Sequence, residues 1–272
     1  MSCAVSGGPD SSALLVLAVA AGCDVEAIHV DHGLRPGSDR EATIVAGTAE
    51  RFGARVRSIR APVEPGPNLE ARARAARRAV LPDGTLLGHT ADDQAETVLL
   101  ALLRGAGIDG LGAMGPRHRP ILRLRRAETH GLCASLGLDV VDDPTNRDPV
   151  HRRNRVRHEV LPLLAEVADR DLVPVLTRQA ELLRDEGELL DELAAELDPA
   201  DVAAMRVAPV ALARRALRRW LRTEHPPRAA DVERVLRVVA GDHVATEVGG
   251  RRIARRGGRL VIQATSAPGP GW

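Results

Sequence analysis

The first 145 residues of this chain alternate between short apolar runs and longer segments whose apolar residues recur at helical spacing, and this alternation limits the fold more than any other feature. The expected strands are 3–5, 25–30, 54–59, 85–88 and 138–141, and the expected helices are 11–21, 38–52, 68–80, 92–103 and 127–136. Parallel strands need crossover connections of about a dozen residues or more, which such helices supply. The pattern therefore predicts an α/β fold with a twisted parallel sheet that carries helices on both faces.

Three polar segments directly follow expected strands, at residues 6–11, 31–35 and 89–97. Ligands of such sheets bind beyond the carboxyl ends of the strands, so we expect the three segments to face one crevice. The first segment reads SGGPDS and combines glycines, which permit close backbone approach, with the unpaired amide groups of a helix start, which attract phosphate. The competing interpretation is that Asp10 and Ser11 only cap the helix.

Two common phosphate-binding loops are absent from the sequence. The chain contains no lysine, so it cannot supply the lysine of G-x-x-x-x-G-K-[ST], and no G-x-G-x-x-G follows the first strand. Kinase-like and dinucleotide-binding folds are therefore disfavoured.

Arginine is gathered into four clusters, although the formal net charge is only +1. The clusters lie at 117–126, 147–158, 214–222 and 251–259, and each holds five arginines and at most one acid. Such clusters are typical of proteins that bind a phosphate backbone, while solvated helix faces give similar runs. Four of them together favour a nucleic acid as a partner.

The remaining composition is ordinary for a soluble protein, with 44% hydrophobic and 28% charged residues. No stretch approaches the roughly 20 apolar residues of a membrane span, and no basic signal region precedes the first apolar segment, so we expect a cytoplasmic protein without membrane contact. Cys3, Cys23 and Cys133 are scattered and form no C-x-x-C pair, which argues against a metal or redox centre.

Three domains follow from these patterns. Residues 1–150 form the expected α/β domain, residues 151–240 a smaller, mainly helical domain, and residues 241–272 short strands with a tail whose composition predicts disorder. The elements expected after residue 175 are the helices 176–197, 209–222 and 228–239 and the strands 245–248 and 259–263, with a glycine-rich turn between the strands.

The glycine loop resembles the pyrophosphatase loop of the N-type ATP pyrophosphatases, the PP-loop superfamily. Further motifs resemble the tRNA(Ile)-lysidine synthetase family, namely HVDHGLR (29–35), GHTADDQAET (88–97), LLRGAGIDGL (102–111) and DPTNRD followed by RRNRVRHEVLPLL (143–164). The resemblance covers residues 1 to about 165 and implies an adenine nucleotide alpha hydrolase-like fold. It also implies that residues 1–150 are the ATP-binding PP-loop catalytic domain and that residues 151–240 are a tRNA-binding domain.

The resemblance also implies a reaction. ATP adenylates C2 of the cytidine at the first anticodon position of a tRNA(Ile) with a CAU anticodon, and the amine of free L-lysine displaces AMP to give lysidine, so that AUA is read as isoleucine. The implied partners are this tRNA and L-lysine, and the sequence leaves a homodimer open.

Candidate roles combine the resemblance with residue chemistry. The residues expected to bind ATP are Ser6, Gly7, Gly8, Pro9, Asp10, Ser11, Asp31 and His32. A carboxylate beside polyphosphate is repelled unless a cation bridges them, so Asp10 is the expected Mg²⁺ ligand. The alternative is a helix cap that is turned away from the ligand.

The GHTADDQAET segment supplies candidates for lysine binding and proton transfer. Asp92 and Glu96 are four residues apart and Asp93 and Glu96 three apart, so at least one acidic pair shares a helix side and can receive a cationic amine. A carboxylate or His89 must also remove a proton from this amine before it attacks. The competing interpretation is a helix start, because Thr90 and Asp93 approximate a capping box.

Basic residues supply the candidates for tRNA contacts. They are Arg35, Arg152, Arg153, Asn154 and Arg157, of which Arg153 and Arg157 share a helix face. The expected catalytic group consists of Asp10, His89, Asp93, Glu96 and Arg153.

Other functions compete with this interpretation. A change of nucleophile to sulfur or ammonia would make the chain a PP-loop tRNA thiolase or an amidotransferase such as an NAD synthetase, but the absence of C-x-x-C and the presence of DPTN with RRNRVR argue against both. A catalytically inactive nucleotide- or RNA-binding module would bind ATP or tRNA without producing AMP.

Overall fold

A computed structural model describes residues 1–33, 39–64, 66, 69–224 and 226–264. The chain divides into two compact units, Met1–Arg184 and Asp185–Trp272. Arg35 and the expected disordered tail lie outside the described residues. The expected domains are defined by the ligands that they would bind, and the division into compact units does not test this. The boundaries at residues 150 and 240 therefore stay predictions.

Unit 1 is built on a four-stranded parallel sheet in the order β3-β2-β1-β4. Its strands are β1 (Ser2–Ala4), β2 (Glu26–Asp31), β3 (Arg55–Arg60) and β4 (Leu86–Leu87). The central strand β1 places Cys3 opposite Ala27 of β2 and Leu86 of β4. The prediction of an α/β fold with a parallel sheet is confirmed.

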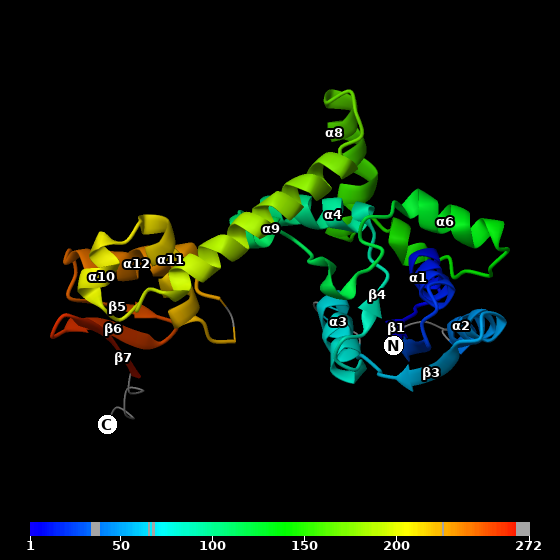
Figure 1. Cartoon of the computed structure of the whole chain (residues 1–272), viewed down its shortest axis with the longest axis horizontal. Helices are drawn as coiled ribbons and strands as arrows, with labels where there is room; N and C mark the ends of the chain where they lie inside the picture. The colour runs from blue at the N-terminus through cyan, green and yellow to red at the C-terminus, as the bar shows by residue number, and fades with distance from the viewer. Residues whose placement is uncertain (34–38, 65, 67–68, 225, 265–272) are drawn as a thin grey trace. The chain divides into compact units, whose positions relative to one another are not determined.

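The crossover helices of this sheet are α1 (Pro9–Ala20), α2 (Asp39–Arg51) and α3 (Leu69–Val80). The connections through α1 and α2 run from β1 towards β3, whereas α3 returns to the other side of β1, so right-handed crossovers place α3 on the opposite face. Figure 1 shows α1 and α2 on one side of the strands and α3 on the other. Leu14 and Leu15 of α1 are fully buried in the core against the sheet.

Further helices continue unit 1 after β4. They are α4 (Ala91–Leu102), α5 (Ile108–Leu111), η1 (Pro116–His118), α6 (Arg126–Ser135), η2 (Pro144–Arg147), α7 (Arg152–Arg155), η3 (Val156–Val160) and α8 (Leu161–Val167). The segment η3 is a π-helix between α7 and α8, a form that is often found at functional sites. Helix α9 (Val173–Ala195) contains the boundary between the two units.

The prediction of a strand at residues 138–141 is wrong. This segment belongs to no strand, and the amide of Val141 instead donates to the carbonyl of Gly7 at 2.9 Å. Its apolar side chains cover the glycine loop, since a Cβ on Gly7 would lie 2.7 Å from Cγ2 of Val141. The apolar run therefore packs against the glycine loop through Val141 and does not form a strand.

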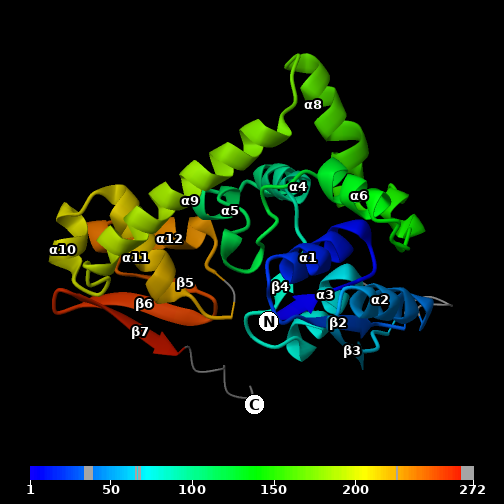
Figure 2. The ribbon, with the colours of Figure 1, turned by 45° about the vertical axis from the view of Figure 1, so that its right-hand side comes forward.

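Unit 2 joins helices and a small antiparallel sheet around one core. Its other elements are α10 (Val202–Val207), α11 (Val210–Leu221), α12 (Ala229–Ala240), β5 (Ala245–Val248), β6 (Arg251–Arg256) and β7 (Arg259–Ala264). Figures 1 and 2 show these helices packed over the sheet, whose order is β5-β6-β7. Leu217, Val235 and Ile253 are completely buried in this core.

The prediction of a glycine-rich turn between two C-terminal strands is also wrong. Residues 251–256 form the central strand, and the glycine pairs on either side of it make the turns. Ile253 faces the core although four arginines share its strand. Within the described residues, no helix combines the length and apolar character that crossing a membrane requires.

Candidate active site

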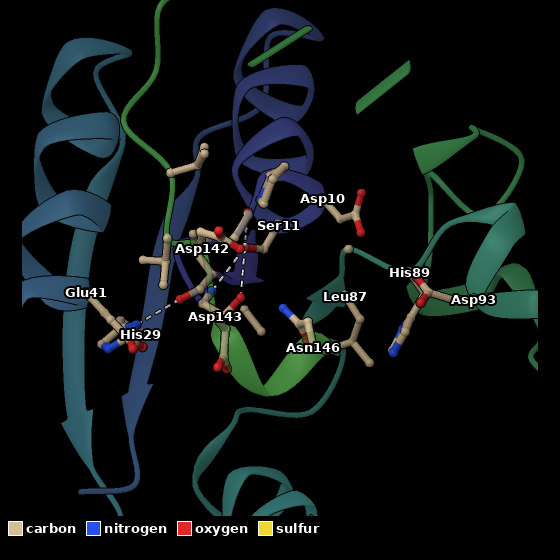
Figure 3. A pocket seen from close by; sticks show the side chains of 18 of the residues that line it. Asp10, Ser11, His29, Glu41, Leu87, His89, Asp93, Asp142, Asp143 and Asn146 are labelled. Atoms are coloured by element: carbon tan, nitrogen blue, oxygen red, sulfur yellow. Dashed lines mark hydrogen bonds between the residues drawn. The ribbon is translucent and has the colours of Figure 1, made fainter. Parts of the chain in front are cut away.

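A cavity of about 810 Å³ opens at the carboxyl ends of the sheet strands. It is lined by residues of all three polar segments that the sequence placed there, together with the segment 140–143. Figure 3 shows Asp10, His89 and Asp93 on one side of this cavity and His29 and Glu41 on the other. The strand ends therefore bring the expected segments into one crevice.

The glycine loop presents free backbone amides to this cavity. Gly7 has a φ of 84°, a left-handed conformation that other residues rarely adopt. Among the described residues, the amides of Gly7, Gly8, Asp10 and Ser11 have no acceptor. Unpaired amide donors at a helix start suit an anion such as polyphosphate.

The two serine hydroxyls of the loop are engaged within it. The hydroxyl of Ser11 donates to the carbonyl of Gly8 at 2.9 Å and accepts from the amide of Ser6 at 3.1 Å. The hydroxyls of Ser6 and Ser11 lie 3.2 Å apart. These hydrogen bonds shape the loop, and a direct contact between either hydroxyl and phosphate stays a prediction.

The capping interpretation of Asp10 and Ser11 does not match their contacts. The N-cap of α1 is Gly8, and no side chain caps this helix. Asp10 Oδ1 accepts from the hydroxyl of Thr129, and its Oδ2 lies 3.7 Å from Nε of Arg126. The carboxyl of Asp10 therefore belongs to the site rather than to the helix end.

Asp10 fits a divalent cation that is shared with phosphate. Burial raises the pKa of its carboxyl, the hydrogen bond from Thr129 lowers it, and the charge of Asp93 raises it further. A cation beside Asp10 would compensate this charge, and Mg²⁺ is commonly held by one or two carboxylates plus substrate phosphates. No group of three His, Cys, Asp or Glu side chains in the described ranges could hold a metal alone. Phosphate oxygens and water would therefore complete the coordination.

Glu96 is the most enclosed charge of the site, with a side chain that is 0% exposed. Its oxygens accept from Nε of Arg153 at 2.6 Å, Nε of Arg157 at 2.7 Å and Nη2 of Arg126 at 3.1 Å. Asp93 shares all three partners, since its Oδ1 lies 2.9 Å from Nη2 of Arg126, 3.0 Å from Nη2 of Arg153 and 3.8 Å from Nη2 of Arg157. Three arginines thus hold both acids in one buried network.

Asp93 serves the helix start and the site with different oxygens. Its Oδ2 accepts from the amide of Thr90 at 2.8 Å and from the hydroxyl of Thr90 at 3.1 Å, while Oδ1 faces the arginines. Burial raises the pKa of Asp93, but the charges of Arg126 and Arg153 outweigh it and hold this pKa below its ordinary value. The capping contact and the site contact are therefore both present, and the carboxylate stays ionised at neutral pH.

Asp92 lines the second cavity together with Glu96 and binds a further arginine. Its oxygens accept from Nε and Nη2 of Arg125, each at 3.2 Å, and from the amide of Arg126 at 2.7 Å. These bonds outweigh the effect of burial and lower the pKa of Asp92.

A second cavity of about 200 Å³ lies beside this network. Its polar lining contains both charge signs, from Asp92, Asp171, Glu96, Arg126 and Arg157. Its other walls are made by Leu161, Pro162, Ala165, Leu172 and Val173. A cavity of this kind suits a small zwitterion with an apolar stem.

His89 follows β4 and lines the large cavity. Burial lowers the pKa of His89 to about 4, against the opposing charge of Asp93, and the charge of Arg119 adds to the lowering. Its Nδ1 is buried without a partner among the described residues. His89 is therefore neutral at physiological pH.

The end of β2 contributes two histidines to the large cavity. The ring of His32 donates through Nδ1 to the carbonyl of Ala61 at 2.9 Å. Asp31 is not among the lining residues of the described chain, and its Oδ1 accepts from the amide of Gly33 at 2.8 Å. His29, which the sequence did not single out, is 1% exposed and lines the cavity.

The expected tRNA contacts of α7 and η3 have different surroundings. Arg153 and Arg157 face Glu96, whereas Arg152 is exposed. Asn154 is buried, and its Nδ2 donates to the carbonyls of Thr145 at 2.7 Å and of Asp148 at 2.9 Å. The amide of Asn154 thus holds the preceding loop in place.

Sequence reasoning missed the residues that connect these parts. They are His29, Arg125, Arg126 and Thr129. Arg126 belonged to an arginine cluster that predicted only phosphate binding. The available signal was the run of acids in GHTADDQAET, because buried acids require cations, but nothing in the sequence says which arginines supply them.

The sequence of this chain matches family models and curated proteins. A family model described as a PP-loop domain matches residues 1–164, and one described as a TilS substrate binding domain matches residues 201–261. The tRNA(Ile)-lysidine synthase of Nocardia farcinica is 46% identical over 235 residues, covering 80% of this chain and 74% of that protein. The synthase of Streptomyces coelicolor is 38% identical over 295 residues, covering 96% and 84%.

A solved structure supports the fold alone. The U34-tRNA thiolase NcsA from Methanococcus maripaludis, with its [4Fe-4S] cluster, superimposes with a TM-score of 0.54 at 19% identity. The match covers 67% of this chain and 72% of that chain.

Proposed function

This chain belongs to the tRNA(Ile)-lysidine synthase family, and on that premise we propose that it uses ATP to convert a cytidine of tRNA(Ile) into lysidine. In the proposed reaction the C2 oxygen of the first anticodon cytidine attacks the α-phosphate of ATP, and pyrophosphate leaves. The amine of free L-lysine then attacks C2, and AMP leaves with that oxygen. The observation that carries the proposal is one cavity that contains both a loop of free amides and the network around Arg126.

The amides of the loop before α1 are proposed to bind the polyphosphate of ATP. The unpaired amide groups and the dipole of α1 both stabilise the negative charge of the leaving pyrophosphate. Asp10 would hold Mg²⁺ beside it, and this ion neutralises charge on the leaving group when bound. The adenosine is proposed to lie between the end of β2 and α2, where His29, His32 and Glu41 line the cavity.

Free L-lysine is proposed to enter the 200 Å³ cavity. Asp92 and Glu96 supply negative charge for an ammonium group, and Arg126 and Arg157 supply positive charge for the carboxylate. Asp93 acts through the same network, since it shares Arg126 and Arg153 with Glu96. Both charge signs beside an apolar wall support an amino acid rather than ammonia or sulfide as the nucleophile donor.

Proton removal from the attacking amine is proposed to involve His89. Asp93 and Glu96 are saturated with arginine contacts, which suits them to binding and positioning. His89 is neutral and has an unpartnered ring nitrogen in the described structure, so it can receive a proton.

The tRNA is proposed to contact both units. The match of residues 201–261 to a substrate-binding domain supports unit 2 as one contact region. In unit 1 the exposed side chain of Arg152 suits a phosphate contact, while Arg153 and Arg157 would act from the network around Glu96. The CAU anticodon and a homodimer stay predictions.

The decisive experiment follows transfer of label from L-lysine to tRNA. Purified protein is mixed with ATP, Mg²⁺, radiolabelled L-lysine and an unmodified CAU-anticodon tRNA(Ile) transcript, and acid-precipitable label is counted. We expect ATP-dependent labelling by the wild type, none by Asp10→Asn, and wild-type labelling by Asp83→Asn, which changes an exposed acid far from the loop in sequence.

Two other outcomes contradict the proposal. Release of AMP without label in the tRNA would point to a different nucleophile, such as ammonia or a sulfur donor. Binding of ATP or tRNA by a folded wild-type protein that releases no AMP would point to a catalytically inactive binding module.

A further inference from the structure

Four arginines, of which Arg77 lines the large cavity, differ from all those described in the network, because they pair with no acid in the described part of the chain. They are Arg74, Arg77 and Arg78 of α3 and Arg119, which follows η1. The arginines of the network, by contrast, all contact carboxylates. A group of uncompensated cations beside a reaction site indicates an anion that is supplied by a ligand.

The arginines of α3 run from the surface to the cavity. Their spacing of three and four residues places Arg74, Arg77 and Arg78 on one side of the helix. Arg74 and Arg78 are exposed, whereas Arg77 is half-buried and lines the cavity with Leu87 and His89. Burial lowers the pKa of Arg77, and the charges of Arg74 and Arg78 lower it further, so a bound anion would stabilise this arrangement.

Arg119 extends the same positive region. The charge of Arg78 reaches Arg119 and lowers its pKa, after the larger effect of burial. Nη1 of Arg119 donates to the carbonyl of Gly115 at 3.1 Å, while its Nε is buried without a partner among the described residues. Arg77 and Arg119 both act on His89, which places them beside the proposed proton acceptor.

The chemistry of the site distinguishes between three anions. The polyphosphate of ATP already has the loop amides, and the carboxylate of lysine has Arg126 and Arg157 at the second cavity. Three guanidinium groups along a helix, of which only the innermost reaches the cavity, match a chain of phosphates better than a single small anion. Arg153 and Arg157 both donate to Glu96, whereas the arginines of α3 pair with no acid among the described residues.

We infer that Arg74, Arg77, Arg78 and Arg119 bind phosphodiester groups of the tRNA strand that carries the reacting cytidine. Arg77 contacts the phosphate nearest to this cytidine, and the exposed arginines contact its neighbours. This inference rests on the proposed function, because it assigns the tRNA as the ligand of the large cavity's edge.

The test measures binding of an unmodified CAU-anticodon tRNA(Ile) transcript at several NaCl concentrations. Each phosphate contact contributes about one unit to the slope of log affinity against log salt. We expect Arg77→Gln and Arg78→Gln each to weaken tRNA binding by about tenfold and to reduce this slope by about one. The KM values for ATP and lysine stay unchanged.

Arg72→Gln provides the matched control on the same helix. Its guanidinium donates to the carbonyl of Glu64, and we expect its tRNA affinity and salt slope to equal those of the wild type. Circular dichroism melting of each variant shows whether the fold is retained.

Several results would overturn the inference. A raised KM for ATP with an unchanged salt slope would assign Arg77 to the triphosphate, and a raised KM for lysine would assign it to the carboxylate. No change in any of these quantities would show that these arginines bind no substrate. A wild-type protein that binds tRNA but forms no lysidine would refute the proposed function, while the salt slopes of the variants still decide this inference.

Discussion

Arg126 joins the acids of two helices into one site. Its guanidinium lies 3.7 Å from Asp10 Oδ2 and donates to Asp93 and Glu96, and its backbone amide donates to Asp92. Burial opposes the charge of Arg126, but the carboxylates of Asp93 and Glu96 outweigh it and raise its pKa. A buried charge is costly unless a charge of opposite sign compensates it. The loss of one acid therefore leaves the buried arginines with uncompensated positive charge.

Replacing Glu96 with glutamine tests this dependence. The variant Glu96→Gln keeps the shape of the side chain but removes the charge that three arginines share, so we expect the free energy of unfolding to fall by about 3 kcal/mol. In the matched control Glu159→Gln, the acid also accepts from an arginine but is 49% exposed, and we expect a much smaller loss because water screens an exposed ion pair. Urea unfolding measures both values. Equal losses would contradict a special role for the buried network.

His89 links stability to pH. Its pKa is about 4 in the folded protein, compared with an ordinary value of 6.5, so only the unfolded state binds a proton at His89 between these pH values. The free energy of unfolding therefore falls as the pH falls through this window. Between pH 7 and pH 5 the free energy of unfolding should fall in the wild type by more than in His89→Gln. We expect the difference between the two losses to reach up to about 2 kcal/mol. Urea unfolding at the two pH values checks this, and identical pH dependence would show that His89 does not contribute.

At the scale of elements, the loop before α1 is positioned by its neighbours. The carboxyl end of β4 approaches so closely that a Cβ on Gly88 would lie 2.8 Å from the carbonyl oxygen of Asp10. On the other side, Val141 donates to the carbonyl of Gly7. The loop is thus held between two segments, which fixes the position of its backbone amides.

Gly88→Ala should therefore impair nucleotide binding. We expect the added methyl group to displace the loop and to weaken binding of a non-hydrolysable ATP analogue by at least about tenfold, because small misplacements of binding groups are costly. In the control Gly47→Ala, the glycine is exposed within α2 and a Cβ meets no neighbour. This control should gain about 0.5 to 1 kcal/mol of stability and keep the affinity. Calorimetric titration compares them, and unchanged affinity in Gly88→Ala would show that the loop can move freely.

At the scale of the whole molecule, charge compensation decides which arginines are available to a ligand. Many members of the four sequence clusters contact acids that are distant in the chain, as in the pairs Arg214–Glu233 and Arg259–Asp198. The uncompensated arginines around the large cavity come mainly from α3, which lies outside those clusters. Local charge density therefore predicted a nucleic-acid partner, while the tertiary structure determines which arginines pair with acids.

The two units also depend on different kinds of packing. Unit 1 buries the apolar residues of a parallel sheet and its crossover helices, while unit 2 shares one core between helices and an antiparallel sheet. The strand of residues 251–256 joined that core although it is rich in arginine, because Ile253 and the pairing with both neighbours outweigh the polar pattern.

The sequence by itself determined the α/β class, the position of three polar segments at the ends of strands and the family resemblance, because periodicity, glycine positions and motif spacing are local properties of the chain. Only the tertiary structure decided which cations compensate Asp93 and Glu96, that Asn154 holds a loop, and that residues 138–141 cover Gly7 instead of joining the sheet. The physical reason is that these contacts join residues far apart in the chain, where charge pairing and burial depend on packing in three dimensions and not on local pattern.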